Sequence, residues 1–239
     1  MTPLPFVIIG SGPAGVSAAW PLVEKGHEVL MLDAGLQTSP AVATRRPDLS
    51  QLRQGYPNAW RELLHDDLSA LKRMEGQSPK LRTGAGRFSV PAFFEQNCIH
   101  TENFRSTGVL ANGGLSNLWG AVASTFTPDE FDTQGAPFTQ MQESYKRVAA
   151  RIGISGVRDD DMAEILGDDY PIQPPLPLST TATAILNAYG KDKRCKPQDY
   201  DFRLGRVRNA VLSKDSGQRL GCYQCKACMW GCPGSAIYN

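Results

Sequence analysis

The feature that most constrains the fold is a Gly-x-Gly-x-x-Gly motif formed by Gly10, Gly12 and Gly15. An apolar run over residues 4–9 comes directly before it, and a helical pattern from about Pro13 to Lys25 follows. The tight turn requires the first glycine, close approach of a pyrophosphate requires the second, and the third lets the helix pack on a sheet. The helix N-terminus then presents free N–H groups and a positive dipole to phosphate. The pattern predicts a strand, a phosphate-binding turn and a helix in succession.

A second apolar run, "EVLMLDAG", predicts a buried strand that ends at Asp33. Two such strands joined by a helix form a parallel β-α-β unit. An acid at the end of the second strand, about 20 residues beyond the first glycine, can accept hydrogen bonds from a ribose hydroxyl. The sequence therefore predicts an α/β, Rossmann-like dinucleotide-binding domain with a parallel sheet. Its predicted cofactor-binding residues are Gly10, Gly12, Pro13, Ala14, Gly15, Asp33 and Ala34.

Two alternatives remain open at this glycine motif. The motif by itself does not separate FAD from NAD, and a tight turn without a ligand has the same pattern.

Within the predicted helix, Pro21 removes the hydrogen bond to the Ser17 carbonyl and is expected to kink the helix, and Gly26 is the expected stop. The residues available for burial on this helix are Ala14, Ala18, Ala19, Leu22 and Val23.

Further elements are expected along the rest of the chain. The pattern indicates helices at about Trp60–Met74, Gln140–Ile152 and Thr181–Tyr189, loops with short strands over 83–120, and a proline-rich extended link at "YPIQPPLPLS". A capping box between Thr139 and Gln142 is expected to start the second of these helices, with Met141, Tyr145, Val148 and Ile152 on its buried face. The predicted segments are 1–38 for the first β-α-β unit, 39–125 for flavin-proximal loops and helices, 126–205 for a helical and Pro-rich part, and 206–239 for a Cys-rich loop.

The composition excludes several classes of function. Of the 239 residues, 41% are hydrophobic and 21% are charged, which is typical of a globular protein. A formal net charge of +1 provides no broad field for nucleic acid or an acidic membrane. No apolar run approaches the ~20 residues that span a bilayer, and the N-terminus lacks the basic region of a signal peptide. We therefore expect a cytoplasmic protein without nucleic-acid partners.

The stretch "NGGLSNLWGA", residues 112–121, resembles the flavin-proximal loop of glucose–methanol–choline (GMC) oxidoreductases. The likeness is to a bacterial branch with cholesterol-oxidase-like and sugar-associated members, and "VLMLDAG", "TPDEF" and "RIGISGVRDDD" resemble the same branch. The resemblance implies FAD as the cofactor and oxidation of a CH–OH group in an alcohol, sugar or sterol. It places Gly113, Gly114, Ser116, Asn117 and Trp119 near the pyrophosphate and isoalloxazine.

The chain departs from the GMC pattern in its histidines. Members of the family are considerably longer and carry a catalytic histidine in the C-terminal half, whereas this sequence has only His27, His65 and His100, none in the family's motif. These three are expected to be surface or structural residues, and no catalytic residue is assigned. The chain thus resembles the flavin-binding half of an enzyme, inactive alone and completed by a C-terminal half on a separate chain. The alternatives are a flavin or iron–sulfur electron-transfer module, or a truncated product.

A cysteine loop near the end of the chain carries the second cofactor signal. Cys222, Cys225, Cys228 and Cys232 match the C-x2-C-x2-C-x3-C-P run of bacterial ferredoxins, which predicts a 4Fe–4S cluster. The fourth cysteine of that run usually ligates a second cluster, so a single site requires Cys232 to turn inward or a contribution from Cys98 or Cys195. A similar loop recurs in the GMC branch, which favours a metal-free loop, and zinc is a third alternative.

Overall fold

A computed structural model of the chain describes two compact units. The described residues are 4–35, 58, 61, 66–68, 71, 81, 86–100, 102–104, 106–132, 137–167, 169–191, 202–226, 228, 232 and 234–238. The first unit holds those within Met1–Gly120 and Tyr223–Ile237, and the second holds those within Ala121–Cys222 together with Tyr238. Most of the helix predicted at about Trp60–Met74 lies outside the described residues. Within the described residues, no helix is long and apolar enough to cross a membrane.

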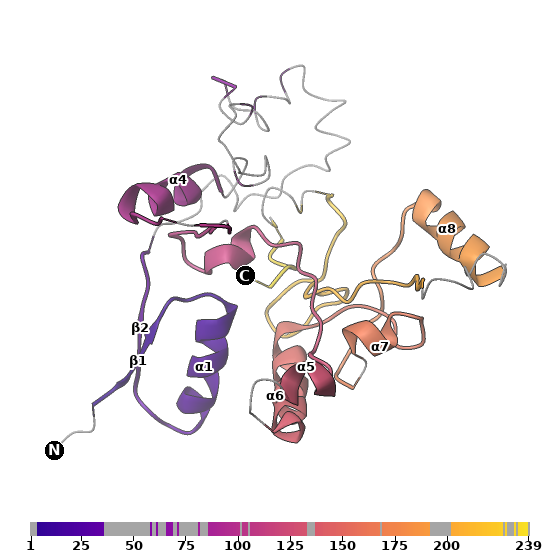
Figure 1. Cartoon of the computed structure of the whole chain (residues 1–239), viewed down its shortest axis with the longest axis horizontal. Helices are drawn as coiled ribbons and strands as arrows, with labels where there is room; N and C mark the ends of the chain where they lie inside the picture. The colour runs from indigo at the N-terminus through magenta and orange to yellow at the C-terminus, as the bar shows by residue number, and fades with distance from the viewer. Residues whose placement is uncertain are drawn as a thin grey trace. The chain divides into compact units, whose positions relative to one another are not determined.

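The first unit begins with the predicted β-α-β arrangement. Strand β1 (Phe6–Ile9) pairs in parallel with β2 (Val29–Leu32), and the helix α1 (Pro13–Glu24) connects them. The register pairs the first residue of β1 with Val29 and the last with Leu32. Helix α1 runs alongside the two strands (Figure 1). The α/β fold and the parallel pairing are therefore confirmed.

Local signals set the limits of α1. Pro13 occupies the first turn, where its missing N–H costs nothing and its fixed φ suits a helix. The helix continues through Pro21 to Glu24, and Gly26 then adopts φ +77° as its N–H donates to the Val23 carbonyl. The predicted stop at Gly26 is confirmed.

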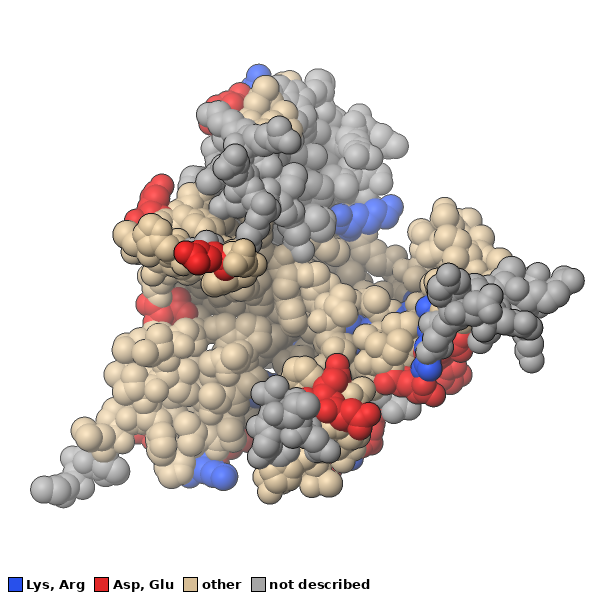
Figure 2. Space-filling model, in the orientation of Figure 1, with Lys and Arg blue, Asp and Glu red and all other residues tan. Residues whose placement is uncertain are grey.

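The strands of the first unit are much more exposed than the sequence predicts. The exposed fractions are 55% for Val7, 85% for Ile9 and 48% for Leu32. On α1, Ala19 is buried and Leu22 half-buried, whereas the other three residues expected to be buried, Ala14, Ala18 and Val23, are exposed. The expectation of buried strands is wrong here because the sheet of the described residues has only two strands, with α1 packed against both. In Figure 2, the visible surface over this β-α-β unit is almost entirely uncharged.

A helix replaces part of the loop region predicted over 83–120. Helix α4 (Gly86–Gln96) includes Pro91, which usually breaks a helix interior at a cost of about 3 kcal/mol. Val90 of this helix is fully buried and packs with Leu118 and Phe94. Because most helix stability in proteins comes from tertiary packing, this contact explains why α4 forms despite its proline. The short 3-10 helix η4 (Gly114–Asn117) follows.

The second unit contains four helices among its described residues. They are α5 (Pro128–Asp132), α6 (Phe138–Ile152), α7 (Ala163–Leu166) and α8 (Thr180–Lys191). Helices α6 and α8 confirm two of the sequence predictions, each within two residues at its N-terminus. On α6, Ile152 is buried and Met141, Tyr145 and Val148 are half-buried, as the apolar periodicity predicts.

The capping box forms at a different helix from the one predicted. Thr139 lies inside α6, and the N-cap Pro137 makes no side-chain hydrogen bond. Instead, Thr127 and Glu130 form the box at α5. The Glu130 carboxylate accepts hydrogen bonds from the Thr127 N–H at 2.8 Å and from its hydroxyl at 2.9 Å. The segment "TPDEF" contains the Thr-x-x-Glu pattern of such a box, so this signal is present in the sequence.

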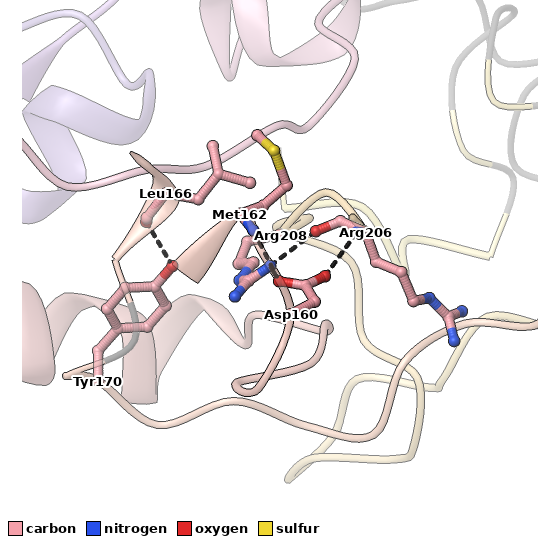
Figure 3. Close-up of polar contacts among 6 residues, drawn as sticks. All are labelled: Asp160, Met162, Leu166, Tyr170, Arg206 and Arg208. Carbon is pink, nitrogen blue, oxygen red and sulfur yellow. Dashed lines mark hydrogen bonds and ion pairs between the residues drawn. The ribbon is translucent and has the colours of Figure 1, made fainter. Parts of the chain in front are cut away.

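A buried ion pair joins two segments of the second unit. Arg208 is fully buried, and its Nη1 donates to Asp160 Oδ1 at 2.8 Å and to the Arg206 carbonyl at 2.7 Å (Figure 3). Asp160 Oδ2 also accepts the Arg206 N–H at 2.6 Å. Because Arg208 lies next to Asn209, which pairs with Ser155 in an antiparallel bridge, the ion pair anchors the bridged segments to the loop before α7.

Candidate dinucleotide-binding site

The glycine turn has the geometry that a phosphate-binding turn requires. Gly10 adopts φ +92°, a left-handed conformation that favours glycine, and its N–H donates to the Leu32 carbonyl at 2.7 Å. A Cβ placed on Gly15 would lie only 1.9 Å from the Gly10 carbonyl oxygen. The turn therefore depends on glycine at both positions, which is the physical reason for the close packing of α1 on β1.

The N-terminus of α1 is open to an anion. Gly12 is the N-cap, and no side chain caps it. No acidic residue occupies the first turn, so no carboxylate there competes with a phosphate. The first intrahelical bond runs from the Val16 N–H to the Gly12 carbonyl at 3.0 Å. The N–H groups of Ala14 and Gly15 precede this bond and have the position that binds phosphate in dinucleotide folds.

The second glycine loop packs against this turn. Gly113 and Gly114 adopt φ +84° and +60°, and the Gly114 N–H donates to the Ala111 carbonyl at 2.8 Å. A Cβ on Gly12 would meet the Gly113 carbonyl oxygen at 3.4 Å, and one on Gly114 would lie 3.7 Å from the Gly12 Cα. The two loops that the sequence singled out are thus brought together backbone to backbone.

The polar side chains of the second loop stabilise the loop itself. Ser116 Oγ donates to the Gly113 carbonyl at 2.6 Å. Asn117 Nδ2 donates to the carbonyls of Asn112 and Gly114 at 2.8 and 2.9 Å. These bonds hold the glycines in their left-handed conformations. Trp119 is half-buried. The role that Ser116 and Asn117 perform in this structure is therefore loop closure.

Asp33 is positioned by the glycine turn. Its Oδ2 accepts the Ser11 N–H and the Ser11 hydroxyl, both at 2.6 Å, and its Oδ1 accepts the Gly35 N–H at 3.1 Å. The hydrogen bond from the Ser11 side chain lowers the pKa of Asp33 below its ordinary value, with backbone N–H groups including that of Ala34 adding to the effect and desolvation opposing it. The carboxylate is thus ionised at neutral pH. It is also exposed, so a ribose hydroxyl can reach it.

Ser11 is the residue that sequence reasoning missed. Its hydroxyl donates to Asp33 and at the same time accepts the Gly113 N–H at 2.9 Å. The Gly-x-Gly-x-x-Gly motif allows any residue between its first two glycines, so the motif did not identify Ser11 as a site residue. The available signal was a small hydroxyl side chain beside two glycines and an acid, all expected at one end of the sheet.

The described part of the cysteine loop shows no preformed metal site. Cys225 is buried, Cys222 and Cys232 are half-buried, and Cys228 is exposed. Gln224 and Lys226 flank Cys225 with φ near +60°. Among the described residues, no three His, Cys, Asp or Glu side chains gather closely enough to hold a metal ion. The 4Fe–4S assignment to these cysteines remains a prediction. Cys98 is exposed, and Cys195 lies outside the described residues.

The described histidines lie at the surface. His27 is exposed in the turn after α1, and its ring makes an edge contact with the Phe6 ring at 5.2 Å between centroids. His100 is also exposed, and His65 lies outside the described residues.

Comparison with known proteins supports the dinucleotide site. Residues 8–65 match the family described as "NAD(P)-binding Rossmann-like domain". The chain is 33% identical over 99 residues to the D-amino acid dehydrogenases of Neisseria gonorrhoeae strains NCCP11945 and ATCC 700825 / FA 1090. The match covers 40% of this chain and 23% of each relative, so the chain spans about a quarter of the length of these curated relatives. The matched segment and the geometry of the glycine turn together show a Rossmann-like, dinucleotide-binding type of domain in this chain.

Proposed function

We propose that the chain is the FAD-binding part of a GMC-like oxidoreductase that acts on the CH–OH group of an alcohol, sugar or sterol. The observation that carries this proposal is the contact between the turn at Gly12 and the second loop at Gly113. A dinucleotide on the helix N-terminus would lie beside a second, glycine-rich backbone. The likeness of "NGGLSNLWGA" to the flavin-proximal loop then favours FAD over a nicotinamide cofactor.

The ionised Asp33 supports a dinucleotide with free ribose hydroxyls. Both FAD and NAD have such hydroxyls, whereas NADP carries a 2′-phosphate at the ribose position that this acid faces. Two negative charges in direct contact are strongly unfavourable. The pKa of Asp33 lies below its already acidic ordinary value, so the carboxylate is ionised at neutral pH and this discrimination applies there. We therefore expect FAD or NAD to be bound in preference to NADP.

The residues present fit the cofactor. The Gly10 and Gly15 positions allow the helix N-terminus to approach the pyrophosphate, and Asp33 orients the ribose. When bound, FAD supplies the redox chemistry by accepting a hydride from the alcohol carbon. The protein's own contribution in this part of the chain is to bind, to orient and to offset the charge of the phosphates with the first-turn N–H groups of α1.

Replacing Asp33 with alanine is expected to raise the FAD dissociation constant about 10- to 100-fold, because a charge-assisted hydrogen bond contributes about 1.5–3 kcal/mol. Titration of the purified apoprotein with FAD, followed by flavin fluorescence, measures this change. Glu28→Ala is the matched control, because Glu28 is an exposed acid of the same unit that lies before β2, whereas Asp33 lies after it. If well-folded wild-type protein shows no flavin binding, FAD is not its cofactor.

The electron-transfer alternative is tested with the same purified protein. The ferredoxin spacing of Cys222, Cys225 and Cys228 favours it. Iron and acid-labile sulfide are measured after anaerobic reconstitution. Stoichiometric iron and sulfide would support a module that carries a cluster, and absence of both would leave the metal-free loop.

We further propose that a partner chain completes the substrate site. No histidine of this sequence follows the GMC catalytic motif. The exposed apolar side chains of Val7, Ile9 and Leu32 on β1 and β2 are suited to be covered by such a partner. The partner would supply the base that removes the hydroxyl proton.

The chain alone is expected not to oxidise alcohols. General base catalysis contributes about 10²–10⁴-fold to rate, and a base must lie within hydrogen-bond reach of the substrate hydroxyl. The measurement is reduction of a dye acceptor by the FAD-loaded chain over a panel of alcohols and sugars. Robust turnover that is lost in His27→Ala, His65→Ala or His100→Ala would show that the chain carries its own base and would contradict the proposal.

A further inference from the structure

We propose that the Ser11 hydroxyl is a positioning group that joins the ribose-facing Asp33 to the second glycine loop at Gly113, so that both halves of the dinucleotide site reach their binding geometry together. The inference deepens the proposed function and rests on it for the identity of the ligand. Ser11 touches no reacting atom in this arrangement and acts through its two neighbours.

The Ser11 hydroxyl makes one hydrogen bond to Asp33 and one to the second glycine loop. Ser11 Oγ donates its only proton to Asp33 Oδ2 at 2.6 Å, and a lone pair accepts the Gly113 N–H at 2.9 Å. The two bonds therefore run in series, from the Gly113 N–H through the hydroxyl to the carboxylate. Hydrogen bonds in series polarise one another, so the ionised acid strengthens the bond to Gly113.

The hydroxyl is not needed to form the turn itself. The backbone N–H of Ser11 already donates to Asp33 Oδ2 at 2.6 Å, and the Gly10 N–H holds the turn to Leu32 at 2.7 Å. Any residue with a backbone N–H would make the first of these bonds. The hydroxyl adds a second hydrogen bond to Asp33 and the link to Gly113, a residue that lies 102 positions away in the sequence. Of these two bonds, the one to Gly113 joins the two loops.

This link sets the backbone that faces the glycine turn. Gly113 has φ +84°, and its carbonyl oxygen would lie 3.4 Å from a Cβ placed on Gly12. Ser116 Oγ donates to that same carbonyl at 2.6 Å. The peptide units on both sides of Gly113 are therefore held, one by Ser11 and one by Ser116, and the Ser11 bond is the one that depends on Asp33.

The test compares wild-type protein with Ser11→Ala and Ser11→Thr in two measurements. The first is the FAD dissociation constant, and the second is the amide exchange rate of Gly113 in the protein without ligand. Ser11→Ala is expected to raise the dissociation constant about tenfold and to speed Gly113 exchange, because the bond partner of that N–H is removed. Ser11→Thr retains the hydroxyl and is expected to restore both values to within about threefold of wild type.

A double-mutant cycle with Asp33→Ala tests whether Ser11 acts through the acid. If it does, adding Ser11→Ala to the Asp33→Ala variant has a much smaller effect on FAD binding than it has alone. Fully additive effects would overturn the inference, as would unchanged Gly113 exchange in Ser11→Ala. The exchange measurement needs no cofactor, so it decides the role of Ser11 even if the wild-type protein binds no FAD and the proposed function fails.

Discussion

Gly15→Ala is expected to abolish dinucleotide binding and to destabilise the first unit. The added Cβ would lie 1.9 Å from the Gly10 carbonyl oxygen and 3.4 Å from Ile8 Cγ2. The nearer atom belongs to the backbone of the phosphate-binding turn, so relief of the clash must move either the turn or the whole helix α1. Overpacking of this kind costs about 1–3 kcal/mol and sometimes more. Because the displaced atoms also form the site, we expect FAD affinity to fall more than about 100-fold.

The measurements are FAD titration and urea unfolding of the same preparation. Gly190→Ala is the control, because Gly190 lies in α8, is exposed and has open space where its Cβ would be placed. That variant is expected to bind FAD as the wild type does. If Gly15→Ala binds FAD normally, the close packing of α1 on the turn is not required for the site.

Asp160→Ala is expected to destabilise the second unit by about 3–5 kcal/mol, because removing one partner leaves a buried charge uncompensated. The charge is that of Arg208, which is fully buried and makes its ion pair with Asp160 at 2.8 Å (Figure 3). Its Nε and Nη2 have no hydrogen-bond partner among the described residues, and without Asp160 its Nη1 would keep only the uncharged Arg206 carbonyl as an acceptor. The substitution also removes the acceptor of the Arg206 N–H. A loss of this size is a large share of the stability of a typical domain.

Urea unfolding followed by circular dichroism measures the change. Asp169→Ala is the matched control, since Asp169 pairs with Lys146 at the surface with 64% of its side chain exposed, and exposed pairs contribute about 0–1 kcal/mol. The double variant Asp160→Ala, Arg208→Met removes the buried charge and is expected to recover part of the lost stability. A loss below about 1 kcal/mol in Asp160→Ala would contradict the assigned role of this pair.

Local signals were sufficient to predict the elements that position the candidate site. The β-α-β unit follows from a glycine motif between two apolar runs, and the ends of α1 follow from Pro13 and Gly26, because each of these residues restricts its own backbone. The apolar periodicity that predicted α6 and α8 is also a local signal, because it depends only on residues three or four apart. Asp33 was found because an acid at the end of the second strand has a defined place in such a unit.

Tertiary structure decided everything that depends on partners far along the chain. Helix α4 forms although Pro91 lies inside it, because the packing of buried Val90 against Leu118 and Phe94 offsets part of the cost of the proline. The exposure of β1 and β2 depends on how many strands join the sheet, which no local pattern states. Ser11 meets Gly113 across 102 residues, and Arg208 meets Asp160 across 48. Bringing residues so far apart in the sequence into contact costs conformational entropy, which the packing of the whole fold offsets. Local sequence patterns therefore do not predict these contacts, and only the structure shows them.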